Sequence, residues 1–122
     1  MVAINFKAKV ADAVEGGEKR QTIRRTARCK PGDRLQLYTG QRTKKCRRLR
    51  EVVCTDVYPI QITQTSIVVD GMIYALGSVM AYHYAKMDGF EGAPDMVEFF
   101  RKQYGLPFDG FLIEWRQKHS WE

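Results

Sequence analysis

A short stretch near the amino terminus, from Gly16 to Arg24, combines residue types that could do chemistry. Lys19, Thr22 and Arg24 supply an amine, a hydroxyl and a guanidinium directly after the flexible pair Gly16-Gly17. An amine with a lowered pKa can act as a base, a hydroxyl as a nucleophile and a guanidinium as an anion ligand. A strand would point Lys19 and Thr22 to opposite faces, but a turn can bring them together. The bland alternative is a solvated lysine beside an ordinary strand threonine.

Positive charge is concentrated around this stretch. The segment from Lys19 to Arg50 holds thirteen Lys or Arg residues and one acid, a net charge of +12, although the whole chain of 122 residues carries +6. The rest of the chain, with seven basic and thirteen acidic residues, is acidic. In residues 42–50, RTKKCRRLR, six of nine residues are cationic. A solvated face can carry such charge, but the length of the bias favours a polyanion partner.

Length and composition predict a single domain over residues 1–122. A chain with 44% hydrophobic and 28% charged residues is typical of one compact domain. The three cysteines and two histidines have neither disulfide-framework nor zinc-site spacing, so we expect no metal and no cofactor. The first residues lack the apolar core of a signal peptide, and no later run reaches membrane-spanning length. We therefore expect a cytoplasmic protein without a membrane partner.

Hydrophobic periodicity predicts the elements that must position the motif. Alternating residues predict strands around Thr22 and within 2–8, 30–38, 50–62 and 109–119, with a β-hairpin over 66–75. Helical spacing and glycine stops predict helices within 9–17, 78–89 and 92–105.

Three further details follow from the same patterns. Pro59 should mark an edge or a bend of its strand. Val97, Phe100 and Tyr104 should form the apolar stripe of the last helix and face the core. A frayed tail is expected at about 118–122. Together, the expected strands and helices predict an α+β fold with an antiparallel, β-rich body.

Four separated motifs resemble those of the ASCH domain, a PUA-like family of small β-barrel modules associated with RNA. They are the pattern Gly17-x-Lys19-x-x-Thr22-x-Arg24, the stretch KPGDRLQLYTG, the sequence DGF before a helix with EFF, and the last strand FLIEW. In order, they cover almost the whole chain. The resemblance implies a partly open β-barrel, mostly antiparallel, with two to three flanking helices. It also implies a cleft between the helix end at Gly16 and the helix before Gly89, lined or flanked by the basic segment.

The first functional interpretation is an RNA- or nucleotide-binding module in RNA metabolism, with RNA or another single-stranded nucleic acid as its partner. Lys19 and Arg24 would contact phosphates, and Thr22 a base or sugar edge. Tyr38 or Trp115 could stack on bases if exposed, although the alternating strand favours the core for Trp115. The residues expected on the binding surface are Lys19, Arg24, Arg25, Tyr38, Arg42, Lys44, Lys45, Arg47 and Arg48.

The second interpretation is a small hydrolase. Some ASCH-like proteins resemble amidohydrolases that act on N4-acylated cytidine, and this resemblance implies Lys19, Thr22 and Asp88 as the catalytic set. Lys19 would take the hydroxyl proton, Thr22 would attack the amide carbonyl, and Asp88 would orient Lys19 or the cytosine edge. The chain departs from that branch in having an aspartate where the branch has a glutamate, and in its dense basic run. A ribonuclease that uses Tyr38 with Lys19 or Lys44 is a related alternative.

Overall fold

The computed structural model describes residues 1–117, which form one mixed, mostly antiparallel sheet of seven strands and three helices. The strands are β1 (Val2–Phe6), β2 (Gln21–Arg24), β3 (Arg34–Thr39), β4 (Arg47–Ile62), β5 (Ser66–Val69), β6 (Met72–Ala75) and β7 (Phe108–Gln117). The helices are α1 (Ala8–Gly16), α2 (Val79–Met87) and α3 (Ala93–Tyr104). The predicted α+β class is confirmed, and the expected frayed tail lies outside the described residues. None of these helices is long and apolar enough to cross a membrane.

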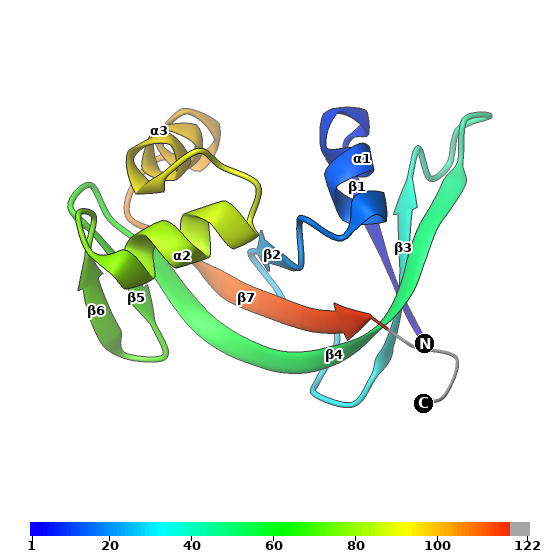
Figure 1. The fold of residues 1–122 in the computed structure, drawn as a ribbon, viewed down its shortest axis with the longest axis horizontal. Coiled ribbons are helices and arrows are strands. Elements are labelled where there is room, and N and C mark those ends of the chain that lie inside the picture. Colours follow the sequence, from blue (N-terminus) through cyan, green and yellow to red (C-terminus); the bar gives the residue numbers. More distant parts are fainter. Residues whose placement is uncertain (118–122) are drawn as a thin grey trace.

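The long strands β4 and β7 form the spine of the sheet. They pair antiparallel from Val52↔Gln117 to Ile62↔Phe108, and Figure 1 shows them as neighbouring curved strands. The first part of β4 also pairs with β3, which pairs in parallel with β1. The end of β4 pairs with β5 of the β5–β6 hairpin, and β2 pairs with β7. The result is a curled half-barrel, which agrees with the expected partly open barrel with flanking helices.

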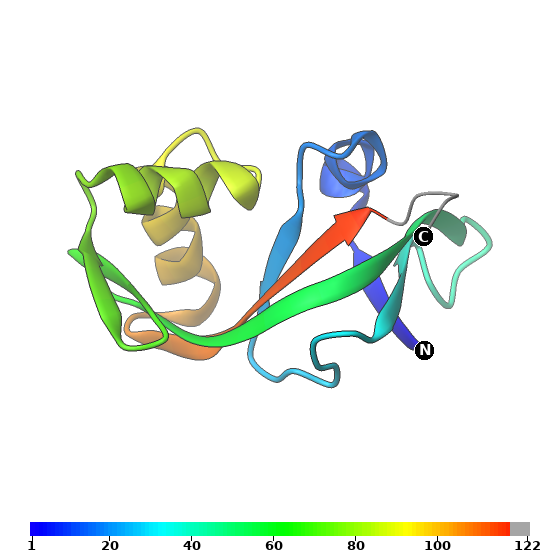
Figure 2. The same ribbon diagram turned by 60° about the horizontal axis from the view of Figure 1, so that its bottom comes forward.

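The helices lie on the concave side of this curled sheet, as Figures 1 and 2 show from two directions. At one end, α1 contributes Val14 to a hydrophobic cluster that includes Trp115. At the other end, α3 contributes Met96 and Phe100 to a second cluster with Ile62. In both views β2 runs between α1 and the α2–α3 pair. Residues on β2 and beside it are therefore placed between two separately packed ends of the sheet.

Pro59, expected at an edge or a bend, lies in a strand with neighbours on both sides, but it pairs only with Phe111 of β7 and directly precedes the β4–β5 pairing that starts at Ile60↔Val69. Its carbonyl oxygen accepts a hydrogen bond from the Asp70 N–H at 2.9 Å. The N and O of one strand residue point the same way, so the missing Pro59 N–H faces this last rung of the β4–β5 pairing. The proline therefore costs one bond at the end of a ladder. The basic run also enters the sheet earlier than expected, because β4 begins at Arg47.

Candidate functional site

The segment between α1 and β2 places Lys19 against the end of α2. Gly17 ends α1 with a left-handed φ of 87°, which confirms the predicted glycine stop. The Lys19 N–H then donates to the Ala13 carbonyl oxygen at 3.0 Å, and the Arg20 N–H donates to the Met87 carbonyl oxygen at 3.3 Å. These bonds tie the segment to both helix ends, so the Lys19 side chain is held beside the last turn of α2.

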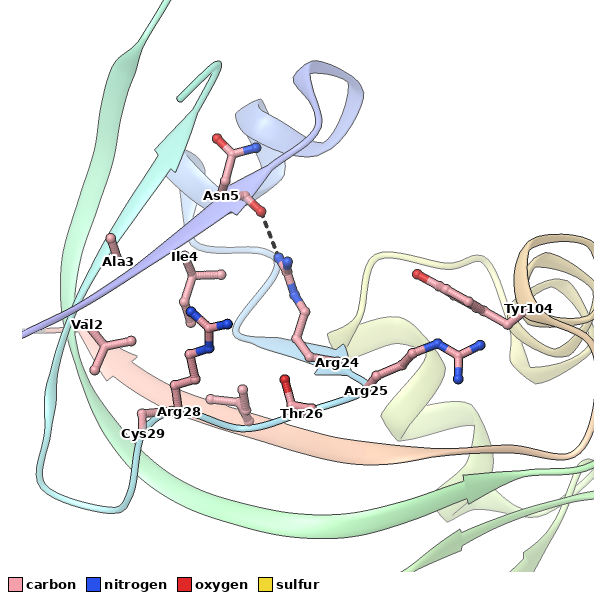
Figure 3. A pocket seen from close by; sticks show the side chains of 11 residues that line it. Val2, Ala3, Ile4, Asn5, Arg24, Arg25, Thr26, Arg28, Cys29 and Tyr104 are labelled. Carbon is pink, nitrogen blue, oxygen red and sulfur yellow. Dashed lines mark hydrogen bonds between the residues drawn. The ribbon is translucent and has the colours of Figure 1, made fainter. Parts of the chain in front are cut away.

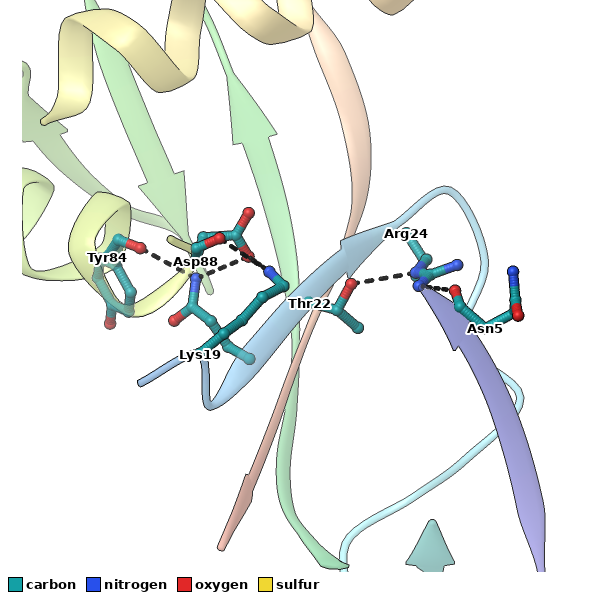
Figure 4. Close-up of polar contacts among 7 residues, drawn as sticks. Asn5, Lys19, Thr22, Arg24, Tyr84 and Asp88 are labelled. Carbon is teal, nitrogen blue, oxygen red and sulfur yellow. Dashed lines mark hydrogen bonds and ion pairs between the residues drawn. The ribbon is translucent and has the colours of Figure 1, made fainter. Parts of the chain in front are cut away.

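Lys19 and Asp88 form a buried ion pair, drawn in Figure 4. Lys19 Nζ lies 3.1 Å from Asp88 Oδ1 and donates to the Asp88 carbonyl oxygen at 2.9 Å. The two side chains are only 6% and 8% exposed. Asp88 caps the C-terminus of α2, where carbonyl groups lack helical partners and a cation is favoured. The ammonium group of Lys19 therefore has a structural role in addition to any chemical one.

Burial moves the pKa values of the two partners toward each other. Desolvation lowers the pKa of Lys19 below its ordinary 10.5, against the attraction of Asp88 and with a smaller contribution from Arg24. Desolvation likewise raises the pKa of Asp88 above its ordinary 3.8, against the effects of Lys19, Gln21 and Arg24. Both shifts make the ammonium group of Lys19 easier to deprotonate than that of a lysine in water. A lysine in this position is suited to accept a proton.

Thr22 and Arg24 share a face of β2, as their spacing predicts. Arg24 Nε donates to Thr22 Oγ1 at 3.1 Å, and Arg24 Nη2 donates to the Asn5 carbonyl oxygen of β1 at 2.8 Å. Figure 4 shows this chain of contacts on the side of β2 away from Tyr84. A cation that donates to Oγ1 favours the oxyanion form of the hydroxyl, because the charged form gains more from the bond.

These groups line one cavity of about 490 Å³, which we call the Lys19 cavity. Its polar and charged lining includes Lys19, Thr22, Arg24 and Asp88. Its aromatic lining consists of Phe6, Phe90, Phe99, Phe100 and Tyr104. The volume falls in the range of about 300–1,000 Å³ that is common for small-molecule sites. The structure thus brings Lys19, Thr22 and Asp88, expected as a catalytic set, to the wall of one cavity.

Six of the expected basic residues do not line this cavity, namely Arg25 and five residues of the β3–β4 hairpin. The hairpin residues are Arg42, Lys44, Lys45, Arg47 and Arg48. All five are exposed, and Arg47 Nη1 lies 2.8 Å from Glu15 Oε1 of α1. Arg25, by contrast, lies next to the cavity, with its guanidinium 4.9 Å from the centre of the Tyr104 ring. The expected binding residues therefore fall into a cavity group and a hairpin group.

Neither of the proposed stacking residues lies at the Lys19 cavity. Trp115 is 5% exposed and packs edge-on against Phe6 with ring centroids 6.0 Å apart, so the core position that its alternating strand favours is confirmed, and Trp115 offers no stacking surface. Tyr38 is half-buried on β3, where its hydroxyl donates to Gln36 Oε1 at 3.0 Å. Tyr38 does not share the cavity with Lys19, so this structure offers no common site for that ribonuclease pair.

Two residues at the site were missed by sequence reasoning. Gln21 is fully buried, and its Nε2 donates to Asp88 Oδ1 at 3.3 Å and to the Tyr84 carbonyl oxygen at 3.0 Å. Among the described residues, its Oε1 has no hydrogen-bond partner. The available signal was alternation, because Gln21 shares strand parity with the buried Ile23. Tyr104, expected in the core, is 46% exposed and lines the cavity.

No protein-family model, curated protein or solved structure significantly matches this chain. Within residues 1–117, no three His, Cys, Asp or Glu side chains gather closely enough to hold a metal ion. The functional assignment therefore depends on the residues and geometry of the site itself.

Proposed function

We propose that this chain is an ASCH-like amidohydrolase that cleaves the N4-acyl amide of an acylated cytidine in the Lys19 cavity. The observation that carries the proposal is the meeting of a buried lysine, a threonine hydroxyl and a buried carboxylate on one cavity wall. The curled, mostly antiparallel sheet with three helices supports the ASCH-like assignment.

The pair of Lys19 and Asp88 supplies the base. Because burial shifts both pKa values toward each other, the shared proton can reside on Asp88 and leave Lys19 neutral. Neutral Lys19 then accepts the Thr22 hydroxyl proton while Oγ1 attacks the amide carbonyl carbon. Arg24, which already donates to Oγ1, places positive charge beside the developing oxyanion.

The attack on the amide carbonyl carbon gives a tetrahedral intermediate, which collapses when Lys19 returns the proton to the amide nitrogen. The C–N bond breaks, cytidine leaves as the neutral amine, and the acyl group remains on Thr22 as an ester. Water then attacks the ester with Lys19 as its base, which releases the carboxylic acid and restores the Thr22 hydroxyl. Each cycle consumes one water and needs no oxidant or reductant.

The aromatic wall of the cavity fits a planar base. Phe90 and Phe99 lie with ring centroids 5.4 Å apart, and Tyr104 borders the same cavity. Proteins that recognise unpaired bases commonly stack them on such rings and read their polar edges with side chains. Stacking would place the substituted edge of cytosine toward the polar wall that holds Thr22.

Binding of RNA or another single-stranded nucleic acid is a second candidate function, favoured by the exposed cations of the β3–β4 hairpin. Among these hairpin cations within the described chain, only Arg47 lies in a salt bridge. Exposed, flexible cations are the usual contacts for phosphates of a polynucleotide. In this arrangement the hairpin would hold the nucleic acid while the cavity received one base.

The decisive experiment measures hydrolysis of N4-acetylcytidine by the purified protein and by Thr22→Val. The substitution keeps the branched shape and removes the oxygen, so we expect turnover to fall by several orders of magnitude while substrate binding survives. Thr65→Val is the matched control, because this exposed turn threonine lies outside the cavity lining. Turnover that persists in Thr22→Val excludes the nucleophile assignment. Absence of turnover by the wild type, at any pH tested, rejects the amidohydrolase.

A further inference from the structure

A second cavity, of about 390 Å³, continues the Lys19 cavity along β1 and β2. The two cavities share Asn5, Arg24 and Tyr104 in their walls. Figure 3 shows Arg24, Arg25 and Arg28 reaching into the second cavity from β2 and the segment that follows it. The described lining of this cavity contains these three arginines and no acidic residue. We call it the arginine groove.

The guanidinium groups of the arginine groove are available to a ligand. Within residues 1–117, none of the three arginines forms a salt bridge. Arg25 and Arg28 are exposed. Arg24 uses Nε and Nη2 for its hydrogen bonds to Thr22 and Asn5, so its Nη1 remains as a donor for a ligand.

Arg25 is also oriented by its neighbours. Its guanidinium lies 4.9 Å from the Tyr104 ring centre and 5.4 Å from that of Phe108. A guanidinium stacked on an aromatic face keeps its N–H groups directed outward in its own plane. It is therefore held in position without using the donors that an anion needs.

We infer that the arginine groove binds the phosphate of a nucleotide whose base occupies the Lys19 cavity. The substrate is then a phosphorylated nucleoside, either a free monophosphate or a residue within RNA, and not the nucleoside alone. This inference rests on the proposed function of the Lys19 cavity. Planar guanidinium groups match the geometry of phosphate oxygens and often bind them through two parallel hydrogen bonds.

The shared residue Arg24 explains why base and phosphate would bind together. Its Nε contacts the hydroxyl of Thr22 in one cavity, while its side chain lines the arginine groove as well. A nucleotide that spans both cavities would place its sugar near Arg24 and its phosphate near Arg25 and Arg28. The phosphate would then act as an anchor that positions the reacting amide, which raises the effective concentration of substrate at Thr22.

Hydrolysis of four substrates tests this inference. They are N4-acetylcytidine, its 5′-monophosphate, its 3′-monophosphate and a single-stranded RNA oligonucleotide with one internal N4-acetylcytidine. We expect kcat/KM for at least one monophosphate to exceed that of the nucleoside by about tenfold or more. A preference for the oligonucleotide over both monophosphates identifies RNA as the source of the phosphate, and the reverse order identifies a free nucleotide. Equal kcat/KM for all four substrates overturns the inference.

The variant Arg28→Ala sharpens the test, because each protein is compared with itself across substrates. We expect the ratio of kcat/KM between phosphorylated substrate and nucleoside to fall toward one in Arg28→Ala. Arg34→Ala removes the same charge from an exposed position on β3 outside both cavities, so its ratio should equal that of the wild type. An unchanged ratio in Arg28→Ala, or an equal fall in Arg34→Ala, contradicts a specific phosphate contact.

A binding measurement separates failure of this inference from failure of the proposed function. Titrations of the wild type with cytidine and with its 5′- and 3′-monophosphates, followed by nuclear magnetic resonance, require no turnover. We expect one monophosphate to bind about tenfold more tightly than cytidine, with shifts at Arg24, Arg25 and Arg28. This result without hydrolysis would keep the phosphate site and reject the enzyme. Equal affinities would reject the phosphate site even if hydrolysis is observed.

Discussion

The Lys19 cavity and the β3–β4 hairpin each contain an ion pair, and the two pairs differ mainly in burial. Lys19 Nζ lies 3.1 Å from Asp88 Oδ1, and Arg47 Nη1 lies 2.8 Å from Glu15 Oε1. The partners are 6% and 8% exposed in the cavity, but 48% and 47% exposed at the hairpin. The two pairs therefore have similar N–O distances, but the hairpin pair is far more exposed to water. Exposed pairs gain little because solvent screens them, but each member of a buried pair depends on the other.

This difference in burial determines what each region can do. Desolvation lowers the pKa of Lys19, whereas the hydrogen bond that Arg47 donates to the Glu15 carboxylate raises the pKa of Arg47. A cation that loses its proton easily can serve as a base, and one that keeps its proton can only act as a charge. The cavity thus suits chemistry on a bound molecule, and the hairpin suits reversible contact with a polyanion.

Removal of one cation from each pair should give the largest contrast. Lys19→Met leaves Asp88 buried without its partner, so we expect the free energy of unfolding to fall by about 3–5 kcal/mol. Hydrolysis should also be lost, because the base is gone. Arg47→Met should leave the urea midpoint unchanged, because Glu15 remains solvated. Urea denaturation of the wild type and the two variants measures both changes in stability. Equal midpoints for wild type and Lys19→Met would show that the buried pair contributes no stability.

The pH dependence of catalysis should reveal the environment of the cavity. Only the neutral amine of Lys19 can accept a proton, so kcat/KM should rise with pH and level off above the pKa of Lys19. Because burial lowers that pKa below 10.5, the plateau should begin at a lower pH than an ordinary lysine would give. The profile of kcat/KM against pH, corrected for alkaline hydrolysis of the substrate, measures the pH at which the plateau begins.

Asp88→Asn changes the same profile in a defined direction. Attraction to Asp88 raises the pKa of Lys19, so its loss should lower that pKa further. The rise in kcat/KM should therefore move to lower pH in Asp88→Asn, with or without a lower plateau. A shift to higher pH would show that the titrating group is not Lys19.

Local patterns predicted the elements around the site well. Gly17 ends α1 in a left-handed conformation, and Asp70-Gly71 turns the β5–β6 hairpin with φ angles of 51° and 83°. The parity rule placed Thr22 and Arg24 on one face of β2, where a hydrogen bond joins them. These features depend on neighbouring residues, so their physical causes are present in a short window of sequence.

Contacts between distant segments were beyond the reach of those patterns. No periodicity links Lys19 to Asp88, which are 69 positions apart, and their pairing was expected only from the family resemblance. The burial of Gln21 also accompanies contacts with a distant segment, because its Nε2 donates to the Tyr84 carbonyl oxygen of α2 and to Asp88. The separation of the hairpin cations from the cavity likewise depends on the curl of β4, which spans 16 residues. Charge density in the sequence therefore predicted a basic segment but not that its cations occupy two surfaces.

The smallest expected effect concerns the hairpin and tests whether position or net charge attracts a nucleic acid. Arg47→Ala combined with Arg48→Ala should weaken binding of a labelled single-stranded RNA and lower the slope of log affinity against log salt by about 0.7 for each lost phosphate contact. Arg101→Ala combined with Lys102→Ala removes the same charge from α3, where both cations lie near Glu98. This control should keep the wild-type slope, because it removes the same net charge from a surface that is not expected to contact the RNA. Equal losses in the two double variants would mean that the hairpin is no specific contact surface, and that the cations of the arginine groove are the remaining candidates.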